Sequence, residues 1–235
     1  TAEAGITLTG PTTTNLGANL QTDGGNVSIT AGSIIVDAAS VTIDTETGDD
    51  NAAGGVTLGG TVSADAASRD LTIDTSFGGG GALNSGNVSL AGVGGATHVR
   101  DLSVVATNAG SGTAGLVTLN GTIVVDGDVA LSGATISLDG GTGIQTDGGS
   151  ITLTGTVDHN VNGYLIDSES GNNNAAGAIS LGAIQGDGTS LLTIDASSTG
   201  NTGGAVGLSG TSSNVGSLTV ISSGATAGII TGGGA

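Results

Sequence analysis

Residues 86–92 read GNVSLAG, a segment framed by glycines in which the aliphatic Val88 and Leu90 flank the polar Ser89. Apolar and polar residues that alternate with a period of two indicate a half-buried β-strand, because successive side chains of a strand point to opposite faces. Similar runs, such as VTL, LTID, LSVV and ITL, recur along the chain, and glycine interrupts every stretch in which a helix would have to continue. The sequence therefore predicts an all-β protein.

The motif of glycine, an aliphatic residue, serine or threonine, and leucine returns at a nearly constant spacing. It occurs at Val56, Val88, Val117, Ile151, Ile179 and Val206. A second strand type interleaves with it at Leu71, Leu102, Leu192 and Leu218. One coil of a β-solenoid requires such a period, because each coil must return to stack its strands on those of the coil before. We therefore expect a parallel β-helix with about 28–30 residues per rung and about eight rungs.

Alternation also predicts which side chains face the interior of each coil. The expected interior residues are Val56, Leu58, Val88, Leu90, Ile179 and Leu181, whereas Thr57 and Ser89 face solvent. A narrow coil has little interior space, which explains why 235 residues include one Phe and one Tyr. The 48 glycines are expected at corners, where the chain takes a positive φ or passes close to its neighbour.

A longer repeat is superposed on the short one. Residues 20–30, LQTDGGNVSIT, return as residues 144–154, IQTDGGSITLT. The run SVTIDTETGDDNAAGGVTLGG from Ser40 returns as GYLIDSESGNNNAAGAISLGA from Gly163. Related segments at Ala4, Ala114 and Ala227 mark three successive starts. These repeats predict one continuous solenoid over residues 1–235, with units at 4–113 and 114–226 and the start of a third at 227–235.

The charge balance excludes several partners. Twenty acidic residues face two basic ones, Arg69 and Arg100, for a net charge of −18. Nucleic acid and anionic membrane surfaces would be repelled, and no basic patch is present to bind them. The chain has no cysteine for a disulfide or a thiolate metal site, and no apolar run of about 18 residues that would insert into a membrane.

The acidic loop DTETGDDN and the strand ends beside it admit two readings. One is a solvated loop that keeps the protein soluble. The other is a calcium site, because carboxylate oxygens at this density suit a hard cation, although the fold requires no cofactor. The candidate ligands are Asp44, Glu46, Asp49, Asp50 and Asp74. A weaker site is expected in the second copy at Asp167, Glu169 and Asp195, because that copy has asparagine at positions 172, 173 and 174.

Catalysis and ice binding are less well supported. A polysaccharide-cleaving β-helix is the natural enzymatic alternative, but it needs a cation for the developing charge and usually offers aromatic platforms. The residues available for those roles are few and scattered: Arg69, Arg100, Phe77 and Tyr164. His98 and His159 are expected in loops or corners, each without a second histidine nearby. The outward neighbours of Thr57 are glycines, so the threonine rows of an ice-binding face are not formed. We expect no enzyme.

The segments GGNVSITAG, GGVTLGG, GNVSLAG and GGSITLTG resemble the shafts of filamentous haemagglutinin-like bacterial surface proteins, which are large secreted adhesins. The resemblance covers the whole chain and implies a right-handed parallel β-helix exported to the cell surface or the extracellular space. The expected function is a structural shaft or filament segment. Its expected partners are adjoining repeats of a longer chain or further copies stacked end to end. The alternative is a surface module that binds glycans or cations.

Overall fold

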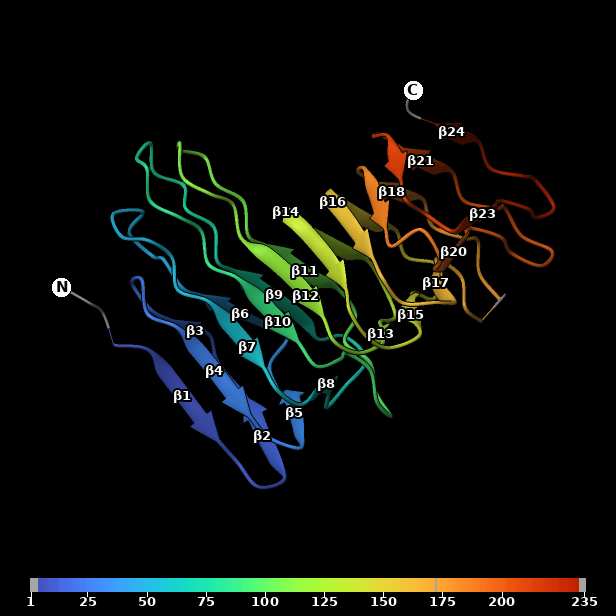
Figure 1. The fold of residues 1–235 in the computed structure, drawn as a ribbon. Coiled ribbons are helices and arrows are strands. Elements are labelled where there is room, and N and C mark those ends of the chain that lie inside the picture. The colour runs from blue at the N-terminus through green and yellow to red at the C-terminus, as the bar shows by residue number, and fades with distance from the viewer. Residues whose placement is uncertain (1–3, 172, 233–235) are drawn as a thin grey trace.

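The computed structural model describes residues 4–171 and 173–232. These residues form 24 strands and no helix, so the predicted all-β class is confirmed. Every pair of neighbouring strands among them is parallel. Figure 1 shows the strands following one another in chain order, with the two termini at opposite ends of the molecule. The described part of the chain contains no helix that could cross a membrane.

The strand pairs form three ladders. The first ladder contains β1 (Ile6–Thr9), β4 (Val27–Thr30), β7 (Val56–Leu58), β10 (Val88–Leu90), β12 (Leu116–Leu119), the later halves of β14 (Val129–Leu138) and β16 (Ile151–His159), β19 (Ile184–Gly186) and β22 (Ser212–Ser213). The third ladder contains β3 (Leu20–Gln21), β6 (Ser40–Asp44), β9 (Asp70–Asp74), β11 (Leu102–Val105), the early halves of β14 and β16, β18 (Ile179–Leu181), β21 (Val206–Leu208) and β24 (Ile230–Gly232). Because β14 and β16 belong to both ladders, the two merge into one sheet of 16 strands.

The second ladder lies between the other two in chain order. It begins with β2 (Thr13–Leu16), β5 (Ser33–Val36) and β8 (Thr61–Ala64), and it ends with β13 (Ile123–Val124), β15 (Gly143–Gln145), β17 (Tyr164–Asp167), β20 (Leu191–Asp195) and β23 (Ser217–Ile221). Single bridges from Val93 to Val62 and to Ile123 connect these two sheets of three and five strands. The chain therefore visits the first, second and third ladders in turn, many times over.

Aliphatic side chains of successive strands stack into buried columns. Val56 pairs with Val88, and Val88 pairs with Val117. The six residues predicted to face the interior are each at most 1% exposed, which confirms that prediction: Val56, Leu58, Val88, Leu90, Ile179 and Leu181. Burial of this kind is the main favourable contribution to folding, about 25 cal/mol per Å² of apolar surface.

The expectation of about 28–30 residues per rung was wrong in the middle of the chain. Val117 pairs with Ile136, only 19 residues further on (117 to 136), and Ile136 pairs with Val157 after 21 residues (136 to 157). Ile151, expected to follow Val117 in phase, pairs instead with Val129 on the third ladder. We call one passage through the first, second and third ladders a coil. The coils contain fewer residues here because β14 and β16 run from the third ladder into the first without an intervening loop. The first ladder also has nine strands rather than eight.

The long loops connect different pairs of ladders in the two halves of the chain. In the first half of the chain they connect the third ladder to the first, at residues 45–55, 75–87 and 106–115. In the second half they connect the second ladder to the third, at residues 168–178, 196–205 and 222–229, with residue 172 not described. Similar sequences thus lie on different ladders: β6 belongs to the third ladder, whereas its counterpart β17 belongs to the second. Equivalent segments of the two repeat units therefore belong to ladders that differ by one position in the order in which the chain visits them.

Candidate functional site

The acidic loop between β6 and β7 is closed at its base by Thr45. This fully buried residue donates its hydroxyl hydrogen to the Gly54 carbonyl oxygen at 2.6 Å. Its backbone N–H bonds to the Asp74 carbonyl of the next coil, and its own carbonyl accepts the N–H of Gly24 in the previous coil. The loop is therefore held to both neighbouring coils by main-chain hydrogen bonds.

Glu46, the next residue, is turned inward instead of into solvent. The residue is only 7% exposed. One carboxylate oxygen, Oε1, accepts the backbone N–H groups of Gly48 at 3.2 Å and Asp50 at 3.1 Å. The other oxygen, Oε2, is buried and has no hydrogen-bond partner among the described residues. Buried carboxylate oxygens nearly always have partners, because a charged group without one loses its hydration uncompensated.

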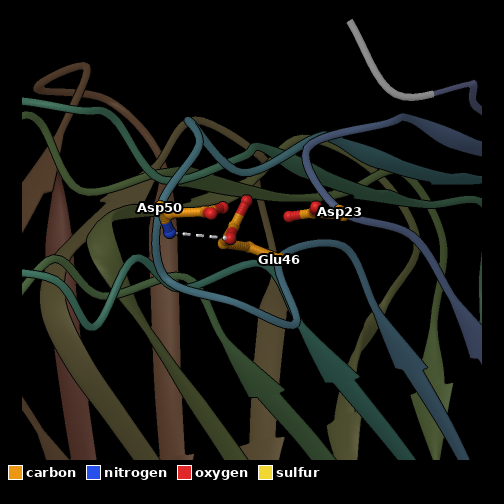
Figure 2. Close-up of side chains that lie close together, drawn as sticks. All are labelled: Asp23, Glu46 and Asp50. Atoms are coloured by element: carbon orange, nitrogen blue, oxygen red, sulfur yellow. Dashed lines mark hydrogen bonds between the residues drawn. The ribbon is translucent and has the colours of Figure 1, made fainter. Parts of the chain in front are cut away.

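Two further carboxylates lie beside Glu46 (Figure 2). Asp50 comes from the same loop, and Asp23 comes from the turn after β3 in the previous coil, which forms an antiparallel bridge with Glu46. One oxygen of each of the three carboxylates lies within 4.8 Å of the other two. Asn51 joins the two aspartates, because its Nδ2 donates to Asp23 Oδ1 at 3.2 Å and to Asp50 Oδ1 at 3.0 Å. We call Asp23, Glu46 and Asp50 the first acidic cluster.

Three of the predicted ligands lie outside this cluster. Asp44 and Asp74 occupy paired positions of β6 and β9, as their spacing predicted. Each accepts a backbone N–H two residues further on, Asp44 from Glu46 at 3.1 Å and Asp74 from Ser76 at 2.9 Å, and so caps its strand. Asp49 has a positive φ of 55° and accepts the N–H of Gly78 in the next coil. Glu46 and Asp50 are the predicted ligands that the structure brings together.

The second repeat unit builds the same arrangement at another corner. Glu169 is 1% exposed, its Oε1 accepts the N–H of Asn173 at 2.8 Å, and its Oε2 is buried without a partner among the described residues. Asp147 bridges Glu169, as Asp23 bridges Glu46. Asn174 donates to Asp147 Oδ1 at 3.2 Å. We call Asp147, Glu169 and Asn173 the second acidic cluster; it has asparagine where the first has Asp50.

The strand-end aspartates of the second unit also follow the prediction. Asp167 and Asp195 are paired positions of β17 and β20, and they accept the N–H groups of Glu169 and Ser197 at 2.9 Å and 2.8 Å. Burial raises the pKa of Asp167, the Glu169 N–H opposes the change, and the negative charges of Asp195 and Glu169 add to it. Like the aspartates of the first unit, they cap strands. Asn172, predicted to weaken this loop, lies outside the described residues.

The basic groups of the described residues are engaged away from both clusters. Arg69 pairs with Asp65 at 2.6 Å, and Arg100 contacts Asp70 and Asp101. His98 lies in a loop, as expected, with its Nδ1 2.9 Å from Asp126 Oδ1. Among the described residues, no basic side chain therefore forms an ion pair with the first acidic cluster.

The expectation that His159 lies in a loop or corner was wrong. It is the last residue of β16, is fully buried, and packs edge-on against the buried Tyr164, with 6.1 Å between the ring centroids. The only phenylalanine, Phe77, is buried as well at 2% exposure. Tyr164 and Phe77 are thus core residues, unavailable as a platform for a sugar ring.

Burial of His159 predicts a loss of stability in mild acid. Burial lowers the pKa of His159 from its usual 6.5, and the Leu191 backbone and the carboxylates of Asp187 and Asp158 oppose that change only in part. As the pH falls, His159 of the unfolded chain therefore takes up a proton at a higher pH than His159 of the folded chain. The contribution of His159 to the free energy of unfolding is complete above pH 6.5 and declines as the pH falls from 6.5 toward the lower pKa of the folded state.

The measurement compares urea unfolding of the wild type and of His159→Phe at several pH values above about 5, where most carboxylates remain ionised. The wild type should lose stability relative to the variant as the pH falls. A difference in unfolding free energy that stays constant across this range would contradict the prediction.

A hollow of about 350 Å³ lies on the outer face of the first ladder. Its floor is a row of small hydroxyl side chains on paired strands: Ser28, Thr57, Ser89 and Thr118. No aromatic, acidic or basic side chain lines it. This surface therefore lacks the groups that general acid–base chemistry requires.

These features define an all-β protein of stacked parallel ladders, with a buried glutamate in an acidic corner loop of each repeat unit. No family model, curated protein or solved structure matches the chain.

Proposed function

We propose that the chain is a structural β-solenoid, a right-handed parallel β-helix that acts as a shaft or filament segment of an adhesin-like protein at the cell surface or outside the cell. Residues 1–235 would form one continuous solenoid, with repeat units at about 4–113 and 114–226 and a further start at 227–235. The parallel register of the three ladders supports this proposal most directly, because a chain that visits the same three ladders in turn forms a stack of coils.

A non-enzymatic role is part of the proposal. Its support is the use of rare functional side chains in the core, as with His159 and Tyr164, and in surface ion pairs, as with Arg69 and Arg100. The acidic surface supports the same view, since a net charge of −18 keeps a long rod soluble. The exported location rests on the family resemblance of the glycine-rich segments.

The end coils suggest how the shaft is extended. β22, β23 and β24 are the last strands of the three ladders, and β1, β2 and β3 are the first. In the third ladder Val206 is fully buried, whereas its partner Ile230 in the last coil is 51% exposed and the adjacent Ile229 is 69% exposed. An open strand edge with exposed aliphatic residues favours pairing with another strand. In our proposal the first coil of a second copy covers this end, as the adjoining repeat would in a longer chain.

Main-chain hydrogen bonds would carry this join. Val206 donates its N–H to the carbonyl oxygen of Ile229, so in a parallel pair the N–H of Ile230 points away from β21. That N–H would bond to β3 of the next copy. A head-to-tail contact of this kind does not close on itself and produces a fibre along the stacking direction.

The test is Ile230→Pro, which removes this outward donor and leaves the earlier strands untouched. Negative-stain electron microscopy should show fibres for the wild type, and short or no fibres for the variant, with the same far-ultraviolet circular dichroism for both. Ile230→Ala, which keeps the N–H, is the matched control and should still form fibres. A wild-type chain that stays strictly monomeric at high concentration would contradict the proposal.

A further inference from the structure

We propose that the first acidic cluster binds one calcium ion, held by Asp23, Glu46 and Asp50, and that the second acidic cluster binds calcium more weakly. The observation behind this assignment is Glu46, which is only 7% exposed and has an Oε2 that is buried without a partner among the described residues. Figure 2 shows the carboxylate of Glu46 between those of Asp23 and Asp50. Glu169 repeats this arrangement at the equivalent position of the second unit.

Three ionised carboxylates this close repel one another, and a positive charge between them would remove that repulsion. Their oxygens lie within 4.8 Å of one another, whereas Arg69, His98 and Arg100 pair with other aspartates and His159 is buried against Tyr164. Glu46 Oε1 is already satisfied by two backbone N–H groups, and these also fix the direction of Oε2. A cation bound to Oε2 would supply the missing partner and reduce the repulsion within the cluster.

The chemistry of the ligands favours calcium. Calcium prefers carboxylate and carbonyl oxygens at about 2.3–2.6 Å, so oxygens on opposite sides of the ion are roughly 4.6–5.2 Å apart. Magnesium bonds at about 2.0–2.1 Å, so its opposite ligands are only roughly 4.2 Å apart. Oxygens within 4.8 Å of one another can share one ion, and the preference for calcium then rests on the type of ligand and the irregular shape of the loop. Calcium also accepts the irregular geometry of a loop, which magnesium does not.

Two glycines leave space beside the cluster oxygens. A Cβ on Gly48 would lie 3.2 Å from Asp50 Oδ1 and 3.7 Å from Asp23 Oδ1. A Cβ on Gly24, whose φ is +88°, would lie 3.0 Å from the Ala52 carbonyl oxygen and 3.8 Å from Glu46 Oε2. The Cβ positions of these two glycines therefore lie within 4 Å of one oxygen of each cluster carboxylate and of the Ala52 carbonyl oxygen, so a methyl group there would crowd the cluster.

The two clusters differ by one charge in nearly the same loop. Asn173 replaces Asp50, so the second cluster has two carboxylates instead of three. The backbone N–H of this residue donates to the glutamate Oε1 in both loops, at 3.1 Å from Asp50 and 2.8 Å from Asn173. Exchanging aspartate and asparagine at these positions should therefore change cation affinity without changing the loop.

A bound ion would connect neighbouring coils. Asp23 belongs to the turn that follows β3, whereas Glu46 and Asp50 belong to the loop that follows β6 in the next coil. Calcium would add a cross-link between the two coils at a corner where one antiparallel bridge, between Asp23 and Glu46, already connects them. Because its ligands lie within one molecule, this role does not depend on the end-to-end stacking proposed above.

The experiment titrates calcium chloride into chelator-treated protein by isothermal titration calorimetry, with magnesium chloride as a parallel series. We expect two sites of unequal affinity for calcium, and weaker binding of magnesium. Asp50→Asn should weaken the stronger site about tenfold or more, and Asn173→Asp should strengthen the weaker site by a similar factor, since removal or addition of a charged ligand changes calcium affinity strongly. Asp74→Asn, which removes an equal charge outside the cluster, is the control and should leave both sites nearly unchanged.

A second pair of variants tests the space without changing charge. Gly48→Ala should weaken the stronger site, whereas Gly80→Ala, where a Cβ would have no neighbour within 4 Å, should not. No calcium binding, or equal weakening by Asp50→Asn and Asp74→Asn, would overturn the proposal. A Glu46→Gln variant that binds calcium like the wild type would also overturn it, because the carboxylate of Glu46 would then not be a ligand of the ion.

Discussion

Replacing Leu90 with aspartate is expected to lower the free energy of unfolding by about 4 kcal/mol or more, the largest effect of any substitution that we consider. Leu90 is fully buried in β10, where it pairs with Leu58 of one neighbouring strand and Leu119 of the other. The carboxylate would replace the middle member of an aliphatic column. Neither neighbour offers it a hydrogen bond, so it would be either a buried charge or a buried protonated acid without a partner.

Thermal or urea unfolding followed by circular dichroism measures this effect. Thr57→Asp is the matched control, because Thr57 occupies the outward position of the adjacent strand β7 and is exposed. That variant should unfold within about 0.5 kcal/mol of the wild type, as surface substitutions usually do. A Leu90→Asp variant that melts like its parent would show that β10 does not face a packed interior.

Much of the fold was predictable because its main physical cause is local. The alternation of Val88, Ser89 and Leu90 specifies which face of a strand is buried, whatever that strand pairs with. The return of the motif specifies parallel stacking, and the pairs of Asp44 with Asp74 and of Asp167 with Asp195 were predicted from spacing alone and are confirmed.

The change of ladder in the middle of the chain was not predictable from the same pattern. Both strand types consist of an aliphatic residue, a polar residue and another aliphatic residue, so either type fits any of the three ladders. Ile151 follows Val117 in motif but stacks on Val129. The decisive feature is that β14 and β16 pass from the third ladder to the first without a loop, and the strand motif carries no information about loop length.

The candidate site was predicted in part for a related reason. Glu46 and Asp50 are near one another in the chain, so their proximity was visible in the sequence. Asp23 lies a coil earlier, and only the bridge between that turn and the acidic loop brings it to Glu46. A signal for it was present, since the segment TDGG occurs at residues 22–25 and again at 146–149. Asp44 and Asp74, in contrast, are taken up by the N–H groups of their own turns.

The corner glycines explain much of the composition, and they support the second large prediction. Gly86 precedes β10, and a Cβ on it would lie less than 3.0 Å from the carbonyl oxygen of Gly54 in the previous coil, a separation that real Cβ atoms do not adopt. The same overlap would occur between Gly115 and the carbonyl of Gly86. A corresponding column at another corner later in the chain consists of Gly127, Gly149, Gly177, Gly204 and Gly228. Each glycine thus occupies a place where the backbone of one coil rests directly on the next.

Gly86→Ala is therefore expected to destabilise the fold by about 3 kcal/mol, the upper part of the range for forcing an extra methyl group into a packed interior. The φ of Gly86 is not positive, so the cost would arise from the contact with the Gly54 carbonyl and not from the backbone conformation. The methyl group would separate two coils at a corner, and the strand pairs of β10 with β7 on one side of it would lengthen.

Gly17→Ala separates this cause from a general intolerance of alanine. A Cβ on Gly17 would meet nothing within 4 Å, and the φ of Gly17 is not positive either. There the substitution should be neutral or slightly stabilising, because alanine restricts the unfolded chain more than glycine does. Urea unfolding of the two variants and the wild type gives the comparison. Equal effects at Gly86 and Gly17 would mean that the coils are not in direct backbone contact at this corner, and that the abundance of glycine has another origin.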